Sequence, residues 1–352
     1  MTEYFFCTYF DRNYCEKGLA LYESLKKHVS SFRLFILCLD DDTFHVLKRL
    51  LCPEIILIRL EDLESRDLNL KAIRNTRSLI EYYFTCTPAF ILYIISLNPY
   101  IDIITYLDAD LYLFSSIDPA YKEMGNNSIL IIEHRFPPEL QHIIKFGRFN
   151  VGYLSFRNDL IGLQCLHWWR ERCIEWCYDI LDGERYADQK YLDHWPEMYP
   201  NVCILQNKGI GTAPWNLARY LVRKEKINRY FIDENPLILY HFHGIYEVGH
   251  LGPLILFDIY LRKSRVRYRQ KADVIQSIYK DYLFQILENR NQIATISDDK
   301  VLQGNSIRSN RKSANSLIQI LIRIRSIILL VFLWIPAILL IKDGIIIRKK
   351  TR

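Results

Sequence analysis

The sequence predicts an α/β fold in which a mixed, mainly parallel sheet is flanked by helices. Along the first 58 residues, segments with the apolar pattern of a strand alternate with segments that have the pattern of an amphipathic helix. This alternation is typical of a parallel sheet with helices on its faces. Half of the 352 residues are hydrophobic and 14% are aromatic, so the chain can build a large core. We therefore expect one large α/β domain with appendages.

Short apolar segments rich in β-branched and aromatic residues predict the strands, because such side chains fit a pleated and buried surface. In chain order we expect strands at residues 4–9, 32–39, 54–58, 103–113, 128–132, 149–156, 201–205 and 237–242. Intervening segments with apolar residues at helical spacing predict helices. These are residues 16–28, 43–51, 69–97, 160–181 and 271–289, with a short helix starting at Tyr186.

Most of the positive charge lies near the C-terminal end. The formal net charge is +6, but ten lysines and arginines follow Gly304 against a single aspartate. The rest of the chain is therefore slightly acidic. A uniformly basic surface for nucleic acid is not indicated, and we expect no nucleic-acid partner.

The cysteines indicate a reducing compartment. Nine are scattered along the chain, an odd number, with no Cys-x-x-Cys pair. The N-terminus also lacks a charged segment followed by an apolar one, which is the pattern of a secretion signal. We therefore expect a cytoplasmic protein without disulfides.

Two carboxylates follow the apolar run that starts at Ile103. Asp108 and Asp110 are one residue apart, and in an extended chain such side chains point to the same side. Two carboxylates at the end of a buried strand repel each other unless a cation lies between them. A divalent ion that prefers oxygen ligands is the natural candidate, and an ordinary acidic turn is the alternative.

Polar residues also follow other predicted strands. Asp11, Asn13 and Tyr14 come after the first strand, Asp188-Gln189 follow a long helix, and His241 ends the last strand. Ligands of open α/β sheets bind outside the carboxyl ends of the strands. A glycine, Gly152, near the start of one strand suggests that another group approaches the backbone closely there.

These motifs, in this order, resemble those of the metal-dependent glycosyltransferases of GT-A fold that retain anomeric configuration, the group of glycogenin and the bacterial lipopolysaccharide galactosyl- and glucosyltransferases. The resemblance covers about residues 4–244. It rests on Asp11-Arg12-Asn13-Tyr14, Tyr106-Leu107-Asp108-Ala109-Asp110, Phe149-Asn150-Val151-Gly152, Asp188-Gln189 and His241-Phe242-His243-Gly244. It implies a GT-A (Rossmann-like) sheet and a UDP-sugar donor.

The resemblance also implies the binding residues. Asp11, Asn13 and Tyr14 would hold the uridine, with an Asx turn and a core tyrosine as the alternative. The donor site would further include Ala109 and Asn150.

The same resemblance implies a metal site. Asp108, Asp110 and His241 would bind Mn²⁺ or Mg²⁺, with His243 as the rival to His241. Imidazole together with carboxylates suits Mn²⁺ better than Ca²⁺. A hydrogen-bonded histidine at a strand end is the alternative for His241.

Other residues would face the sugar and the acceptor. Asp188 and Gln189 would line the anomeric face of the donor, with a helix N-cap as the alternative for Asp188. Trp215 and Asn216 follow Pro214 and would bind the acceptor, with a core tryptophan as the alternative.

Two positions depart from the family pattern. Glu247 stands where members often carry a phosphate-binding lysine, and Lys190 stands where they are often acidic. We therefore expect the diphosphate to draw positive charge from Arg74, Arg77 or Lys190 itself.

The C-terminal region predicts an attachment to membranes. Residues 1–290 would form the transferase domain and the polar residues 291–316 a linker, followed by an apolar and basic tail at 317–352. The uncharged stretch 327–341 is shorter than the ~20 residues that span a bilayer. We expect a helical tail that lies on the membrane or re-enters it. A helix that spans the membrane is the second alternative, and a helix packed inside the protein is the third.

The expected function is therefore the transfer of a hexose from a UDP-sugar to a membrane-proximal or lipid-linked glycan. This would take place at the inner face of the cell membrane, in the synthesis of a bacterial surface polysaccharide such as lipopolysaccharide or capsule. The alternative is a membrane-tethered subunit that binds UDP-sugars without turnover, which Glu247 and Lys190 favour. A nucleotidyltransferase is not favoured, because the glycine- and lysine-rich loop expected near the N-terminus is missing.

Overall fold

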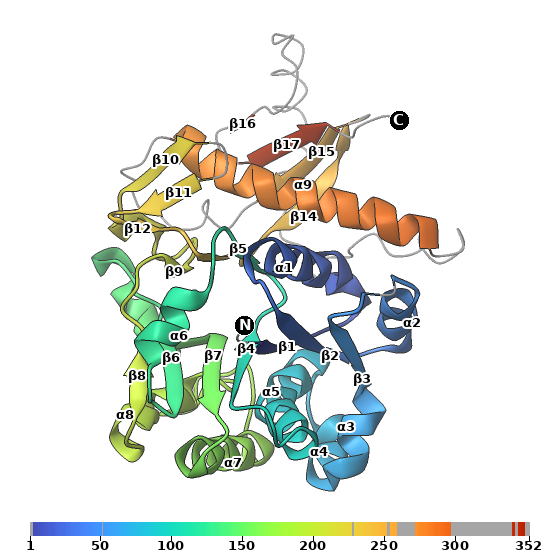
Figure 1. The fold of residues 1–352 in the computed structure, drawn as a ribbon, viewed down its shortest axis with the longest axis vertical. Coiled ribbons are helices and arrows are strands. Elements are labelled where there is room, and N and C mark those ends of the chain that lie inside the picture. The colour runs from blue at the N-terminus through green and yellow to red at the C-terminus, as the bar shows by residue number, and fades with distance from the viewer. Residues whose placement is uncertain are drawn as a thin grey trace.

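A seven-stranded sheet forms the centre of the molecule (Figure 1). The computed structural model describes residues 3–50, 52–226, 229–251, 254–258, 272–296, 340–341 and 344–348. The sheet has the strand order β3-β2-β1-β4-β7-β6-β8. Its strands are β1 (Tyr4–Phe10), β2 (Phe32–Cys38), β3 (Ile55–Arg59), β4 (Ile103–Leu107), β6 (Ile129–Glu133), β7 (Phe149–Arg157) and β8 (Val202–Ile204).

The sheet is mixed and mainly parallel, as predicted. β1 pairs in parallel with β2 and with β4, β2 with β3, and β6 with β8. Only β7 runs antiparallel to its neighbours in this sheet, β4 and β6. Parallel neighbours need crossover connections, and these place helices over the faces of the sheet.

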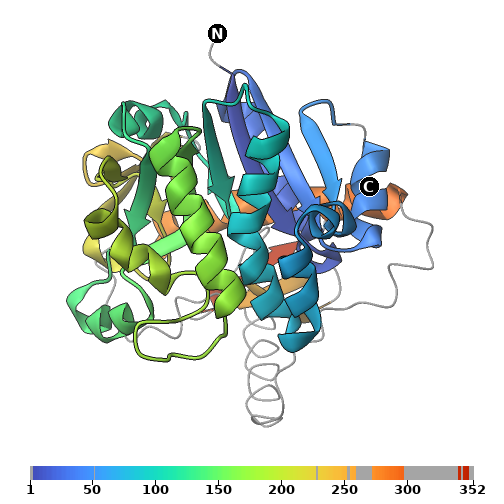
Figure 2. The ribbon, with the colours of Figure 1, turned by 90° about the horizontal axis from the view of Figure 1, so that it is seen from below.

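The helices cover both faces. They are α1 (Cys15–His28), α2 (Asp41–Leu50), α3 (Leu60–Arg66), α4 (Leu68–Ile73), α5 (Leu79–Leu97), α6 (Asp118–Met124), α7 (Leu160–Glu175), α8 (Trp195–Met198) and α9 (Ala272–Ile296). In Figure 2, α5 and α7 lie side by side across one face. Alternate residues of β2 separate the two cores: Phe35 packs with α5 and α7, whereas Leu34 packs with α1 and α2. Burial on both faces explains why the strands are almost continuously apolar.

Helix α5 is the longest apolar helix of this core. Its first turn is capped by Glu81, whose carboxylate accepts from the backbone N–H and the hydroxyl of Ser78. Within the described part of the chain, it alone is long and apolar enough to cross a membrane, but more than half of the relevant window is buried inside the protein. Core packing therefore accounts for its composition.

Helix α7 ends earlier than the predicted 160–181, at Glu175. The guanidinium of Arg77 donates to the carbonyl oxygens of Cys173 (2.7 Å) and Ile174 (2.6 Å) at this end. The last carbonyls of a helix have no partner within the helix, so a donor from elsewhere satisfies them. The predicted helix 69–97 is likewise divided, into α4, a 3₁₀ turn at Arg74–Thr76, and α5.

A small second sheet lies beside the carboxyl edge of the first. It has the order β5-β13-β9, with β5 at Leu111–Leu113, β9 at Ile210–Thr212 and β13 at Leu239–His241. β13 is shorter than the predicted strand 237–242, and β5 leaves β4 as a separate strand, so the predicted strand 103–113 is two strands.

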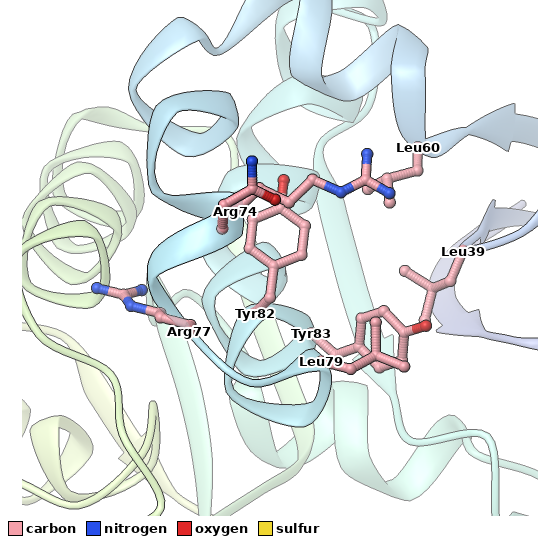
Figure 3. Close-up of a pocket in the computed structure, with 8 residues that line it drawn as sticks. Leu39, Leu60, Arg74, Arg77, Leu79, Tyr82 and Tyr83 are labelled. Carbon is pink, nitrogen blue, oxygen red and sulfur yellow. The ribbon is translucent and has the colours of Figure 1, made fainter.

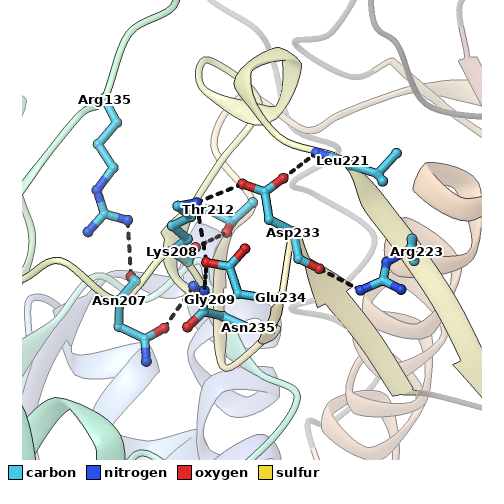
Figure 4. Close-up of polar contacts among 10 residues, drawn as sticks. All are labelled: Arg135, Asn207, Lys208, Gly209, Thr212, Leu221, Arg223, Asp233, Glu234 and Asn235. Carbon is cyan, nitrogen blue, oxygen red and sulfur yellow. Dashed lines mark hydrogen bonds and ion pairs between the residues drawn. The ribbon is translucent and has the colours of Figure 1, made fainter.

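Polar contacts hold the loops around this small sheet (Figure 4). The ammonium of Lys208 lies 3.0 Å from Asp233 and 3.3 Å from Glu234. Asp233 also accepts from the backbone N–H of Leu221 at 2.7 Å, and the guanidinium of Arg135 donates to the carbonyl of Asn207 at 3.1 Å. These contacts fix the connection between β9 and β13, and hence the position of the strand that carries the site histidine. Next to them lies a three-stranded antiparallel sheet of β10 (Val222–Lys226), β11 (Arg229–Ile232) and β12 (Asn235–Pro236).

Helix α9 packs over α1 and closes a third core with the small sheet. It continues to Ile296, beyond the predicted end at 289 and into the stretch predicted as a linker. A further, four-stranded sheet pairs β14 (Tyr246–Leu251), β15 (Leu254–Asp258), β17 (Gly344–Arg348) and β16 (Leu340–Ile341).

The rest of the predicted linker and tail lies outside the described residues. Within the tail, residues 340–341 and 344–348 are strands and not the predicted helix. Membrane association and the limits of the three predicted regions stay predictions.

Candidate functional site

The predicted metal ligands come together where β4 ends. The backbone N–H of Leu111 bonds the carbonyl of Asp108, which turns the chain into β5. β5 pairs antiparallel with β13, so that Leu111 lies opposite His241. Nε2 of His241 is 3.0 Å from Oδ1 of Asp110 and 3.7 Å from Oδ2 of Asp108. Two strands far apart in the sequence therefore carry one cluster.

The cluster is strongly polarised. Burial alone would raise the pKa of Asp110, but the charge and the hydrogen bond of His241 hold it below its ordinary value. Burial would lower the pKa of His241, and Asp110 and Asp108 raise it instead. The pKa of Asp108 is raised, first by burial and also by the charge of Asp110, against the opposing effect of His241. A positive charge near the two carboxylates offsets their mutual repulsion, and the imidazole of His241 lies next to both of them.

The donor atoms suit a divalent transition metal. The ligand atoms of Asp110, His241 and His243 all lie within 4.8 Å of one another. Oδ2 of Asp108 is directed at the same imidazole. Carboxylate oxygens and imidazole nitrogens are ligands that Mn²⁺ accepts readily. His243, the predicted rival, is therefore placed to act together with His241.

Gly152 leaves the room that this cluster needs. A Cβ built at Gly152 would lie 2.7 Å from Oδ1 of Asn150, 2.8 Å from Oδ2 of Asp108 and 2.8 Å from Cε1 of His241. Its carbonyl accepts from the backbone N–H of Asp108 at 2.9 Å. The close approach predicted at this glycine is confirmed, because any side chain would displace a metal-ligand candidate.

Asn150 links the cluster to a buried histidine that the sequence did not single out. Its Oδ1 accepts from the backbone N–H of Gly152 at 3.0 Å, and its amide lies 3.2 Å from Nε2 of His134. Nδ1 of His134 lies 3.2 Å from the carbonyl of Arg148. Burial lowers the pKa of His134 to about 3, so the ring is neutral, with Nδ1 donating and Nε2 accepting.

Trp215 forms one wall of the cluster. Its ring centroid is 5.1 Å from that of His241 and 5.8 Å from that of His243. Its indole N–H and the amide of Asn216 both donate to the carbonyl of His134 at 3.0 Å. Asn216 is completely buried and bonds the backbone of this loop in two further places. It therefore holds Trp215 in place, and the acceptor-binding role of the pair stays a prediction.

Asp188 lies in the same region but not as an N-cap. Its carboxylate accepts from the hydroxyl of Thr87 at 3.1 Å, and its backbone carbonyl accepts from Trp169 at 2.8 Å. The preceding Ala187 has a φ of 48°, a left-handed conformation that a residue with a side chain adopts at a cost. The short helix predicted from Tyr186 is a 3₁₀ turn at Lys190–His194, without a side-chain cap.

Buried polar side chains lie between Asp188 and Asp108. The hydroxyl of Thr87 also contacts that of Tyr9 at 3.1 Å. The ring centroid of Tyr9 lies 5.7 Å from that of Tyr106, whose hydroxyl donates to Oδ1 of Asp108 at 2.8 Å. Burial, and secondly the charge of Asp108, raise the pKa of Asp188 to about 7. Two features of the sequence pointed to these side chains: Tyr9 lies near the carboxyl end of the first strand, and Tyr106 belongs to the motif that contains Asp108.

Gln189 is next to Asp188 and faces the loop before β7. Its amide donates to the carbonyl of Phe146 at 3.2 Å, and its side chain packs against Gly147, where a Cβ would lie 3.2 Å from Cγ of Gln189. Gly147 has a φ of 129°. Asp188 and Gln189 thus lie at this edge of the sheet, and their sugar-lining role stays a prediction.

The predicted uridine residues form a turn. Asp11 accepts from the backbone N–H of Asn13 at 3.0 Å and from its amide at 3.1 Å. This is the Asx turn that the sequence left as the alternative. Tyr14 is not a core residue, since 43% of it is exposed, and the ammonium of Lys17 lies 3.9 Å from its ring centroid.

A pocket of about 190 Å³ opens near this turn, at the carboxyl ends of β2 and β3 (Figure 3). Its lining includes Leu39, Leu60, Arg74, Arg77, Tyr82 and Tyr83. The pKa of Tyr83 is raised by burial and next by the charge of Asp11, so this wall adjoins the turn of the first strand.

The cations predicted for the diphosphate are engaged elsewhere. Arg74 donates to Glu64 at 3.0 Å. Arg77 caps α7, and Figure 3 shows its guanidinium directed away from Tyr83. The ammonium of Lys190 lies 3.5 Å from Glu184. Their role at the diphosphate stays a prediction that these partners disfavour.

No protein-family model matches the chain. YfnF of Bacillus subtilis (strain 168), an uncharacterized protein, is 33% identical over 248 residues, which are 68% of this chain and 80% of YfnF. YfnD of the same strain, also uncharacterized, is 32% identical over 247 residues, 69% of this chain and 78% of YfnD. The chain belongs to the family of YfnF and YfnD.

Solved structures similar to this YfnF-family chain include two glycosyltransferases. The galactosyltransferase LgtC, in complex with donor and acceptor sugar analogues, is 18% identical with a TM-score of 0.46, covering 70% of this chain and 90% of LgtC. Mouse xyloside xylosyltransferase 1 is 14% identical with a TM-score of 0.41, covering 69% and 98% of the two chains. Likeness of this extent carries no argument about activity. The inference for this YfnF-family member therefore rests on the geometry of its own site.

Proposed function

We propose that this chain is a metal-dependent glycosyltransferase of GT-A fold that moves a hexose from a UDP-sugar to a glycan or lipid-linked acceptor. The observation that carries the proposal is the cluster of Asp108, Asp110 and His241 at the carboxyl edge of the sheet. Such an edge is where open α/β sheets bind their ligands. The pocket of about 190 Å³ near the Asp11 turn has room for part of a nucleotide.

Each group of the cluster has a role in this reaction. Asp108, Asp110 and His241 would hold Mn²⁺ or Mg²⁺, and His243 lies close enough to join them. When bound, the metal would neutralise the charge that the diphosphate gains as the sugar leaves. Gly152 keeps the space open, and the neutral His134 orients Asn150. Groups that the fold holds in place would provide the electrostatic stabilisation that this reaction requires.

Asp188 supplies the sugar side of the proposed site. Burial, and secondly the charge of Asp108, raise its pKa to about 7, so part of the carboxyl is neutral near neutral pH. A neutral carboxyl can donate a hydrogen bond to a sugar hydroxyl and does not repel the diphosphate. In a reaction that retains configuration, the acceptor hydroxyl attacks from the face that the diphosphate leaves. Gln189 would line the same face.

A non-catalytic subunit that binds UDP-sugars is the second candidate. Glu247 favours it, because an acid replaces a cation at a position that the resemblance assigns to phosphate binding. Donor hydrolysis distinguishes the two, since a transferase without acceptor passes some sugar to water. With Mn²⁺ and a panel of UDP-hexoses, we expect the purified chain to release UDP from at least one of them. Binding without release would favour the subunit.

The proposed acceptor is membrane-proximal. The basic tail beyond residue 316 would attach the enzyme to the inner face of the cell membrane, where lipid-linked precursors of surface polysaccharides such as lipopolysaccharide or capsule are assembled. This part of the proposal rests on the sequence pattern of the tail alone.

A further inference from the structure

Lys17 is a cation of the site that no motif indicates. It lies in the first turn of α1, directly after the turn formed by Asp11 and Asn13. Its ammonium lies 3.9 Å from the ring centroid of Tyr14. Among the residues that the structure describes, no carboxylate forms an ion pair with this ammonium. Lys17 is also half-buried, so its charge is only partly compensated by water.

Helix α1, which carries Lys17, packs against β5, the strand that begins directly after Asp110. The backbone N–H of Leu113 on β5 donates to the hydroxyl of Ser24 on α1 at 3.0 Å. Burial lowers the pKa of Lys17, and the charge of Asp110 is the largest opposing influence. The influence of Asp110 on Lys17 agrees with the packing of α1 against the strand that follows Asp110. A phosphate group bound to a metal on Asp110 would therefore lie in the field of Lys17.

Two acids, Glu16 next to Lys17 and Glu247 after β13, are both bound by one arginine. Arg290 of α9 bonds both carboxylate oxygens of Glu16, at 2.7 and 2.8 Å. Its remaining Nη1 bonds Glu247 at 2.6 Å. Two parallel bonds between a guanidinium and a carboxylate are strong and directional. Helix α9 thus takes up the acid next to Lys17 and the acid at the position of the missing lysine.

We propose that Lys17 binds the diphosphate of the donor, and that it supplies the positive charge which Glu247 cannot. This inference rests on the proposed function, because it needs a nucleoside diphosphate at the metal. The cation reaches the phosphates from the first helix and not from the strand after His241. Arg290 has a positioning role, since it keeps Glu16 and Glu247 away from the anion.

Binding of UDP and of uridine to the full-length protein in Mn²⁺ tests this, by calorimetry. We expect Lys17→Met to weaken UDP binding about tenfold, the worth of one charge-assisted hydrogen bond, and to leave uridine binding unchanged. Lys17→Arg, which keeps the charge, should bind UDP nearly as well as the wild type. The matched control is Lys26→Met on the same helix, where the lysine lies 5.1 Å from the ring centroid of Tyr22 and should not matter.

A second measurement uses the wild type, in case Lys17→Met does not fold. UDP with Mn²⁺ should protect Lys17, and not Lys26, from reductive methylation of its amine. Wild-type UDP affinity in Lys17→Met, equal losses for UDP and uridine, or a lack of protection would each overturn the role of Lys17. A wild type that binds no UDP at all would instead overturn the proposed function.

Discussion

Nε2 of His241 and Oδ1 of Asp110 lie 3.0 Å apart, and the pairing of β5 with β13 holds them there. The backbone N–H of Phe242 also donates to the carbonyl of Asp110 at 2.9 Å, so a backbone hydrogen bond between the two segments supports the contact. The two groups shift each other's pKa in opposite directions. A bound cation would likewise offset the negative charge of Asp110 at this place.

Replacing Asp110 should weaken metal binding. Asp110→Asn removes a negative ligand and the strongest partner of His241, so we expect Mn²⁺ affinity to fall by at least about tenfold, as ligand changes do in metal sites. Calorimetry with Mn²⁺ measures this directly. Asp42→Asn, at an exposed position on α2, is the control and should bind Mn²⁺ like the wild type. Equal Mn²⁺ affinity in Asp110→Asn would contradict the metal site.

A methyl group at Gly152 should disrupt the site. Gly152→Ala places a Cβ 2.8 Å from Asp108 and 2.8 Å from His241, so we expect a loss of Mn²⁺ binding and about 1–3 kcal/mol of stability. Gly183→Ala is the contrast: it has open space but a φ of +57°, so it should cost about 1 kcal/mol of stability and leave metal binding intact. Unfolding curves and Mn²⁺ titrations separate the two effects. Normal Mn²⁺ binding by Gly152→Ala would mean that the cluster is not packed as described.

Asp188 should make stability depend on pH. Its folded-state pKa, about 7, lies above the ordinary 3.8, so the folded state holds this proton more tightly than the unfolded state does. That advantage is complete below about pH 4 and is lost as the pH rises to about 7. In metal-free protein, Asp188→Asn should therefore gain about 3 kcal/mol relative to the wild type between pH 5 and pH 8. Urea unfolding at both pH values checks this, and a constant difference would contradict the raised pKa.

Arg77 should matter for stability and not for the donor. Arg77→Met leaves the last carbonyls of α7 without their donor, so we expect a loss of about 2–3 kcal/mol with unchanged UDP affinity. Arg172→Met removes an exposed pair with Glu175 on the same helix and should cost under about 1 kcal/mol. A selective loss of UDP binding in Arg77→Met would restore the donor role predicted from the sequence.

The tail should bring the enzyme to membranes. A chain that ends after α9, at Ile296, should stay in the supernatant with vesicles of anionic lipid, whereas the full chain should sediment with them. The shift should weaken at high salt if the basic residues act through their charge. If the shortened chain sediments equally, the membrane contact lies in the folded domain.

The sheet and its covering helices could be predicted because local patterns determine them. That His241 joins Asp108 and Asp110 was implied by the resemblance to a known family, and metal binding by the three stays a prediction. Alternating apolar segments predict strands and helices, and Asp108 and Asp110 share one side of an extended chain. Other features depend on contacts between distant segments. That Arg77 caps α7 follows from the packing of α5 against α7, which no spacing in the sequence reveals.

The charged residues around the proposed diphosphate site also depend on contacts between distant segments. Lys17 looks like an ordinary solvated lysine of an amphipathic helix, and Arg290 lies at the end of a helix whose partner the sequence does not name. Only the packing of α9 over α1 brings Arg290 to Glu16 and Glu247. Sequence patterns therefore predicted the acidic residues of the site but not Lys17 and Arg290, the cations that lie near acidic residues there.

The most direct test of the central claim is the release of UDP from a UDP-hexose by the purified full chain, with Mn²⁺ and with EDTA, in the wild type and in Asp110→Asn. We expect the wild type to release UDP in Mn²⁺ and not in EDTA. We expect the rate of release to fall by at least about a hundredfold in Asp110→Asn, as when a group that stabilises the transition state is removed. Equal release in EDTA, or full activity of Asp110→Asn, would contradict it.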